Sequence, residues 1–244
     1  MRKSNNKKLS VRERKEAKQM RRMLIIGGGC FGVAAAAGIG ATFLDPTFPV
    51  LPGKGTLDDR LTRAGIDSHT LDLTPGIDAK SILIIGTTDC TYCRSFVEDG
   101  LEKLLAYAKA AGLGVAYAPI GLSESSLGST RLLAGFARAN AAPAEILKTV
   151  YAAGLDLRTG RALPIVANRY GEELGLAEHE INKMLSESEL DVTSRIQATM
   201  RTFPIQGTPM FFVANDKAPE RINMFSGWSG FSSLRGRIDA ARIA

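Results

Sequence analysis

The stretch SILIIGTTDCTYC, residues 81–93, decides the fold of this chain. Its first half, Ser81 to Gly86, is apolar without alternation, as expected of a strand that is buried on both faces. Cys90 and Cys93 follow where this strand would pass into a helix. The leading sulfur would then lie at a helix N-terminus, where unpaired N–H groups and the helix dipole favour a thiolate. The sequence therefore predicts a reactive cysteine pair.

Two other interpretations of the pair were weighed against this one. A structural zinc site needs two further ligands, and only Cys30, His69 and His179 remain, scattered along the chain. An inert bridge would close a loop too small to restrain the unfolded chain much, so a bridge that is made and broken fits better. We expect no metal ligands. We also expect no organic cofactor, because glycines 27–29 lie inside an apolar stretch instead of following a strand.

The second motif is Gly207-Thr208-Pro209, followed by the apolar run Met210-Phe-Phe-Val213. A Thr-Pro step entering a strand suits a turn that presents its backbone to a neighbouring chain. Trp228 and Phe231 lie further on and, with Tyr92, are candidates for an aromatic rim that contacts a bound polypeptide or for ordinary core residues.

The periodic spacing of apolar residues, interrupted by Gly and Pro, predicts an α/β chain with a helical block after its second major strand. Thr56 is a candidate helix cap, Gly65 a stop, and Gly100 a point where the helix after the cysteines bends. Strands are expected at 70–73, 81–86, 115–120, 210–214 and 221–225, and helices at 56–64, 93–111, 129–139, 143–153, 164–174, 177–185, 189–201 and 231–242.

The N-terminus has a different composition from the rest. Residues 1–22 hold ten Lys or Arg and two Glu, a charge of +8, so the remainder carries −2 of the net +6. The basic character therefore belongs to this tail, and no nucleic-acid partner is expected. Residues 23–44 contain no charged side chain and would span ~33 Å as a helix, enough to cross a bilayer. The preceding positive charge predicts a cytoplasmic N-terminus, with residues 45–244 outside.

Three fates of this segment remain open. An uncleaved signal anchor is favoured. A cleaved export signal is the alternative, because Arg21-Arg22 before a weakly hydrophobic core resembles a twin-arginine signal. A lipoprotein signal at Cys30 fits worst, because glycines precede that cysteine. The expected division is a tail (1–22), an anchor or signal (23–44), a linker and short helix (45–65), and a redox domain (66–244) with a helical insertion at about 122–200.

Over residues 66–244 the chain resembles the DsbA-like branch of the thioredoxin superfamily, which includes membrane-tethered bacterial members. The cysteine pair after a buried strand, the helical block and the Gly207-Thr208-Pro209 string carry this resemblance in the same order. It implies a thioredoxin-like fold with an inserted helical subdomain. It also implies a cis peptide bond before Pro209, contact of Thr208 with a bound polypeptide, and a glycine, Gly227, that precedes the closing helix.

The resemblance implies a thiol:disulfide oxidoreductase. Cys90 would form a mixed disulfide with an exported polypeptide, and Cys93 would resolve it. Thr91 and Tyr92 would tune the pair, while Asp89 and Arg94 act in opposite senses on a thiolate. Strongly oxidising relatives carry histidine where this chain has Tyr92, so a milder oxidant, an isomerase or a reductase is predicted.

Many relatives also keep a buried acid on the strand before the site as a proton relay. Residues 82–85 are all apolar here, so another group or water must handle the proton of Cys93. The expected setting is the bacterial inner membrane with the catalytic domain in the periplasm, or a cleaved periplasmic protein. A membrane redox partner would recycle the site. Two functions of other classes stay open: a tethered chaperone-like holder of polypeptides, and a metallochaperone that grips Cu(I).

Overall fold

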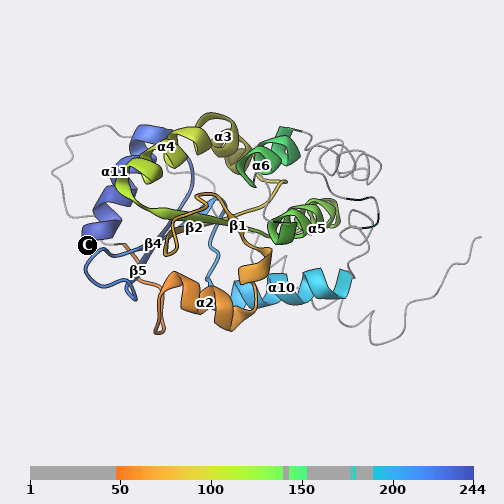
Figure 1. Cartoon of the computed structure of the whole chain (residues 1–244), viewed down its shortest axis with the longest axis horizontal. Helices are drawn as coiled ribbons and strands as arrows, with labels where there is room; N and C mark the ends of the chain where they lie inside the picture. Colours follow the sequence, from red (N-terminus) through yellow and green to blue (C-terminus); the bar gives the residue numbers. More distant parts are fainter. Residues whose placement is uncertain (1–47, 140–142, 153–176, 178, 180–188) are drawn as a thin grey trace, which may run out of the picture. The chain divides into compact units, whose positions relative to one another are not determined.

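The computed structural model describes residues 48–139, 143–152, 177, 179 and 189–244. Strands in this part of the chain form one five-stranded sheet in the order β1-β3-β2-β4-β5 (Figure 1). β2 and β3 are parallel, and the other neighbouring pairs are antiparallel. The predicted α/β class is therefore confirmed. The strands are β1 (Leu71–Asp72), β2 (Lys80–Gly86), β3 (Gly114–Pro119), β4 (Met210–Ala214) and β5 (Ile222–Ser226).

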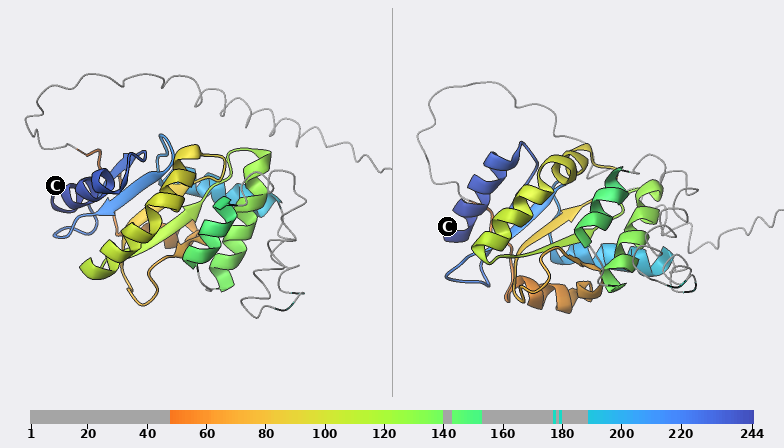
Figure 2. Two further views of the ribbon diagram at one scale, coloured as in Figure 1. Left: turned by 90° about the horizontal axis from the view of Figure 1, so that it is seen from above. Right: turned by 45° about the horizontal axis from the view of Figure 1, so that its top comes forward.

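Helices cover both faces of the sheet. On one face lie α3 (Thr91–Asp99), α4 (Leu101–Ala111) and α11 (Phe231–Ile243); on the other lie α2 (Leu57–Ala64) and α10 (Glu189–Thr202) (Figures 1 and 2). Alternate residues of β2 belong to separate cores, with Ile82 and Ile84 on the α3 side and Leu83 and Ile85 on the α2 side. This is why the strand is apolar at every position.

The helical block after β3 begins with α5 (Glu124–Ala139) and α6 (Pro143–Ala152), and α10 leads back to the sheet. α5 packs against β1 and β3, whereas α6 packs against α5 and α3. The predicted helices at 164–174 and 177–185 lie almost wholly outside the described residues. A short 3-10 turn, η1 (Asp67–His69), precedes β1.

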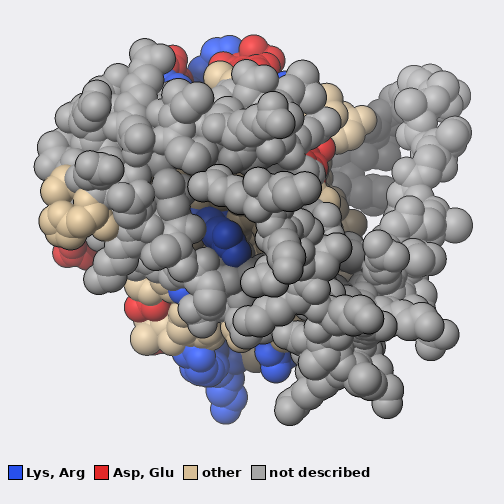
Figure 3. Space-filling view, turned by 90° about the vertical axis from the view of Figure 1, so that its right-hand side faces the viewer, with Lys and Arg blue, Asp and Glu red and all other residues tan. Residues whose placement is uncertain are grey.

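On the face shown in Figure 3, acidic and basic side chains of the described residues lie interspersed.

The helix predicted at 93–111 is two helices. α3 ends and α4 begins at Gly100, which has φ −117° and ψ −30°. A Cβ at this glycine would lie 2.2 Å from Cη2 of Trp228, so the indole ring fills the space that a side chain would take. The bend expected there from the glycine is therefore accompanied by a wedge from the segment before α11.

Residues 48–65, expected to be a linker and a short helix outside the redox domain, pack onto the sheet. The helix α2 starts at the Thr56 cap and ends at Gly65 in the left-handed conformation, as predicted. Val50 bridges to Asn223 at the free edge of β5, and Leu51 is buried. The described residues from 48 onward accordingly belong to a single compact unit. The segment packs there because its apolar side chains are buried against the second face of the sheet.

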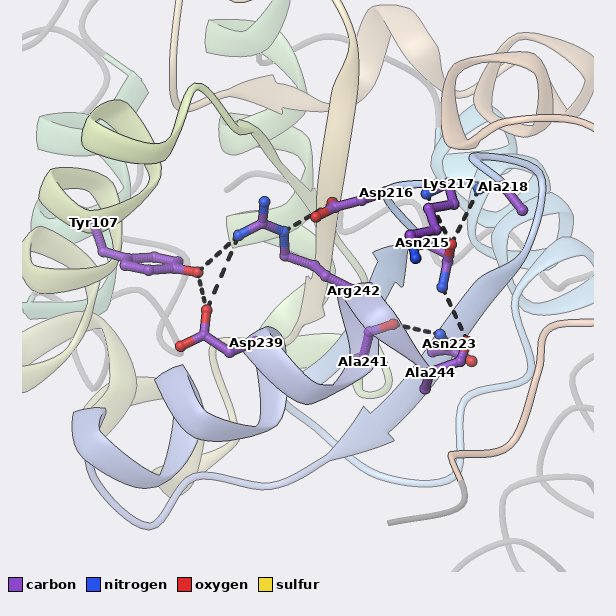
Figure 4. Close-up of polar contacts among 10 residues, drawn as sticks. All are labelled: Tyr107, Asn215, Asp216, Lys217, Ala218, Asn223, Asp239, Ala241, Arg242 and Ala244. Atoms are coloured by element: carbon purple, nitrogen blue, oxygen red, sulfur yellow. Dashed lines mark hydrogen bonds and ion pairs between the residues drawn. The ribbon is translucent and has the colours of Figure 1, made fainter. Parts of the chain in front are cut away.

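The C-terminal helix is held at its end by a polar network (Figure 4). Arg242 donates to Asp216 through Nε at 2.9 Å and to the hydroxyl of Tyr107 through Nη1 at 3.1 Å. Tyr107, from α4, donates in turn to Asp239. The buried amide of Asn223 donates to the carbonyl of Ala241 at 2.5 Å. These contacts tie α11 to both α4 and the β4–β5 hairpin.

No helix within the described ranges combines the length and the hydrophobicity needed to cross a bilayer. The predicted tail and span, residues 1–22 and 23–44, lie outside those ranges.

Candidate active site

Cys90 is the N-cap residue of α3. Its sulfur accepts a hydrogen bond from the backbone N–H of Cys93 at 3.1 Å, in the position where a Ser or Asp oxygen caps other helices. The backbone N–H of Cys90 donates to the carbonyl of Thr87 at 3.1 Å, which fixes the turn between β2 and the helix. The strand-to-helix step that the sequence predicts therefore places this sulfur at the positive end of α3.

The surroundings of Cys90 favour its thiolate. Its pKa is lowered to about 6, first because the thiol of Cys93 can donate a hydrogen bond to it. Contacts with Thr208 and the backbone N–H groups of Cys93 and Tyr92 act in the same direction, and partial burial opposes them. Hydrogen bonds produce the shift, so the charges of Asp89 and Arg94, weighed from the sequence, do not set it.

Cys93 lies behind Cys90 in the core. Its side chain is 1 % exposed, and burial, followed by the neighbouring Cys90, raises its pKa. Both thiols are free in this structure. The pair thus consists of an accessible sulfur whose pKa is lowered and an enclosed sulfur whose pKa is raised.

The Thr208–Pro209 step lies beside the cysteines although it is more than a hundred residues away in the chain. β4 runs antiparallel to β2 with Met210 opposite Ile85, so the residues before β4 meet those after β2. The thiol of Cys90 donates to the carbonyl of Thr208 at 3.1 Å. The Thr208–Pro209 peptide bond is cis, as the resemblance implied.

The candidate rim residues separate into two kinds. Thr91 and Tyr92 are exposed, and Tyr92 shows 63 % of its surface to solvent. Trp228 and Phe231 are half-buried and pack against the main core, with the ring of Trp228 at 5.4 Å from that of Phe96. Tyr92 is therefore free to contact a partner, whereas Trp228 mainly supports α3.

Two residues in the same core cluster as Cys93 have no conspicuous pattern in the sequence. Tyr117 of β3 and Tyr151 of α6 are buried, and their hydroxyls lie 2.5 Å apart. A weak signal existed, because Gly86 ends an otherwise bulky strand, and a glycine in a strand often marks the close approach of another group. The side chain that approaches Gly86 is Tyr117.

Comparisons with known proteins give structural matches only. No family model matches the chain, and no curated protein sequence does. Alpha-DsbA1 of Wolbachia pipientis superposes with a TM-score of 0.54 at 14 % identity, over 71 % of this chain and 90 % of that one. BcfH of Salmonella enterica Typhimurium gives 0.54 at 14 % identity, over 95 % and 85 %. The fold is the DsbA-type thioredoxin fold.

The likeness supports the thioredoxin-like fold that the resemblance of the cysteine pair and the Thr208–Pro209 string implied. At this level of identity the likeness extends to the fold alone. The chemistry of Cys90 and Cys93 therefore rests on the geometry of this chain.

Proposed function

We propose that the protein is a thiol-disulfide oxidoreductase that exchanges disulfides with exported polypeptides through Cys90 and Cys93. The observation that carries the proposal is the half-exposed sulfur of Cys90, capped by the N–H of Cys93, with its pKa lowered to about 6. At neutral pH such a sulfur is largely thiolate, which is both a nucleophile and a good leaving group.

The exchange proceeds in two steps. In the reducing direction, the Cys90 thiolate attacks a client disulfide, an S–S bond to Cys90 forms, and one client sulfur leaves with the electron pair and takes up a proton. Cys93 then loses its proton and attacks Cys90, which closes the Cys90–Cys93 disulfide and releases the second client thiolate. The oxidising direction is the reverse. Stabilising the Cys90 thiolate favours the reduced enzyme and hence client oxidation.

Thr208 and Pro209 form the client-binding element in this proposal. The carbonyl of Thr208 lies 3.1 Å from the sulfur of Cys90, so a polypeptide whose cysteine is bonded to Cys90 would pass along this backbone. Thr91 and Tyr92 tune the site through the first turn of α3, whose N–H groups act on Cys90. The exposed ring of Tyr92 offers an apolar contact to the client.

The setting of the reaction is proposed from the sequence. Residues 23–44 anchor the protein in the bacterial inner membrane, or direct its export before cleavage, and the domain faces the periplasm. An oxidising compartment supplies clients whose cysteines require pairing. A membrane redox partner returns the pair to its working state.

Catalysed reduction of insulin by dithiothreitol, and oxidation of a reduced test protein by the disulfide form, examine the proposal directly. Cys90→Ala should abolish both activities. Cys93→Ala should abolish turnover but retain clients as mixed disulfides on Cys90, and the captured proteins would show the direction. Full activity of Cys90→Ala, or thiols that do not exchange with glutathione, would contradict the proposal. Copper bound by the reduced protein would favour a metallochaperone instead.

A further inference from the structure

The buried hydroxyl pair, Tyr117 and Tyr151, has no part in the exchange described so far. The two side chains come from β3 and from α6, and both are almost completely buried. Their hydroxyl oxygens lie 2.5 Å apart and their rings meet edge to face at 6.4 Å. A hydroxyl in a core is costly unless it is hydrogen-bonded, so this pair is a defined arrangement within an apolar interior.

Gly86 creates the space for this pair. Tyr117 lies opposite Ile84 in the parallel register, and by strand alternation Gly86 faces the same side of the sheet as Ile84, the side covered by α3. A Cβ on Gly86 would be 2.3 Å from the hydroxyl oxygen of Tyr117. The hydroxyl therefore occupies the place of the missing side chain, at the end of β2 that leads to Cys90.

Burial is the main obstacle to ionisation of Cys93, and hydrogen bonds with the backbone of Thr87 and the side chain of Thr208 offset only part of it. The thiol of Cys93 must ionise to attack Cys90, yet burial raises its pKa and residues 82–85 of β2 are apolar. Among the described residues, Cys90 on its own helix acts on the pKa of Cys93, and the charge of Cys93 acts in turn on Tyr117 from β3 and Tyr151 from α6.

Both tyrosines respond to a charge on Cys93. Burial is the main cause that raises the pKa of Tyr117 and of Tyr151, and the charge of Cys93 raises both further. Both hydroxyls are therefore neutral near neutral pH. A neutral hydroxyl near an anion can donate a hydrogen bond to it and adds no second negative charge that would repel it.

One of the two hydroxyl protons of the pair is available for a further hydrogen bond. Two hydroxyls carry two protons, and the bond between them uses one. The other proton can turn toward an anion, and a hydrogen bond to a charged group is about twice as strong as a neutral one. We propose that Tyr117, oriented by Tyr151, stabilises the thiolate of Cys93 in the step that resolves the mixed disulfide. The proposal rests on the function proposed above.

Atoms and electrons balance without a further reactant. Cys93 gives its proton to solvent, and its sulfur attacks Cys90. The new S–S bond forms as the bond from Cys90 to the client sulfur breaks, and that sulfur leaves with the electron pair and takes up a proton. Tyr117 is neutral before and after, and it lowers the barrier by stabilising the anion that attacks.

The test follows the reduced full-length protein as it reacts with dithionitrobenzoate, an aromatic disulfide that releases a coloured thiolate. Attack by Cys90 releases the first equivalent and leaves a mixed disulfide, and resolution by Cys93 releases the second. Tyr117→Phe should slow the second phase about tenfold or more and move its pH profile to higher pH, because one hydrogen bond to a charged group is worth about one pKa unit or more. The first phase should stay within about twofold.

Two further variants make the outcome decisive. Tyr107→Phe removes a hydroxyl that serves only the α4–α11 contact, and it should leave both phases unchanged. Tyr151→Phe should shift the second phase in the same direction as Tyr117→Phe but less. A folded Tyr117→Phe protein with wild-type resolution at every pH would overturn the proposal. If that variant does not fold, an unchanged profile in Tyr151→Phe overturns it. Loss of the first phase in wild-type protein would instead refute the proposed function.

Discussion

Cys90 and Cys93 lie within one helical turn but in different environments, one partly exposed to solvent and the other buried. The cap position leaves Cys90 half-exposed and directs the N–H of Cys93 at its sulfur, whereas Cys93 points into the core. Burial penalises a charge and N–H groups at a helix start stabilise one, so the two pKa values move in opposite directions. The asymmetry between the two sulfurs thus follows from a separation of three residues along the helix.

Titration of the thiolate absorbance in the reduced protein should show an inflection near pH 6, because hydrogen bonds lower the pKa of Cys90 to about 6. Cys90→Ala should lose this inflection, and Cys93→Ala should keep one at a higher pH, since the N–H of residue 93 remains while its thiol does not. An inflection in the strongly acidic range would contradict the milder redox character predicted from Tyr92.

The same shift makes stability depend on pH. A folded-state pKa near 6 lies below the value near 9 of a free thiol, so the unfolded chain binds more protons between these values. The free energy of unfolding of the reduced protein should therefore rise from pH 6 to pH 9, and the contribution of Cys90 should be absent below 6. Urea unfolding at several pH values measures this. Cys90→Ser serves as the control, and an equal rise in that variant would assign the effect to other groups.

At the scale of single residues, the sequence pointed to the two cysteines but not to the buried pair of tyrosines. Spacing and position singled out Cys90, Cys93, Thr208 and Pro209, and the structure brings these residues together. Tyr117 could not be found in this way. A tyrosine in a strand is usually a core residue, and its meeting with Tyr151 depends on how α6 packs, which no local pattern encodes.

Among the helices and strands, the break between α3 and α4 depends on the close packing of the Trp228 indole against Gly100. The ring of Trp228 lies against Gly100, packs edge to face with Phe96, and leaves no room for a methyl group. The sequence predicted a bend from the glycine but a continuous helix over 93–111. The wedge responsible comes from a segment more than a hundred residues later, so local propensity alone could not predict the break.

Gly100→Ala should lower the free energy of unfolding by about 1–3 kcal/mol, because the added methyl group overpacks a rigid ring. Gly236→Ala is the matched control. It lies exposed in α11 with open space around the Cβ position, and it should gain up to about 1 kcal/mol from helix propensity. Thermal or urea unfolding compares the two, and equal effects would refute the steric explanation.

For the whole domain, the segment before the first strand is a structural part of the fold. Arg60 of α2 is 3 % exposed and donates to the carbonyls of Pro52, Gly53 and Gly55 at 2.6–3.0 Å. Prolines in the segment around residue 50 suggested a linker, but the buried Leu51 and this guanidinium fasten it to the sheet. Composition alone could not distinguish an extended segment that packs from one that does not.

Arg60→Met should destabilise the domain by about 3 kcal/mol, because three hydrogen bonds from a buried guanidinium to part-buried carbonyls are lost at once. Arg63→Met, one turn along the same helix on its exposed side, should stay within about 0.5 kcal/mol. Urea unfolding monitored by circular dichroism distinguishes them. A small effect at Arg60 would mean that the segment contributes little to the fold.

Trp228 is the only tryptophan in the chain, and it lies over Gly100 and against Phe96, one turn along α3 from Cys93. The protein therefore carries a single tryptophan fluorophore, at the junction of α3 and α4. Closing or opening the sulfur bridge should change the emission of this one indole, so the kinetics of every redox step can be followed by unlabelled stopped-flow fluorescence.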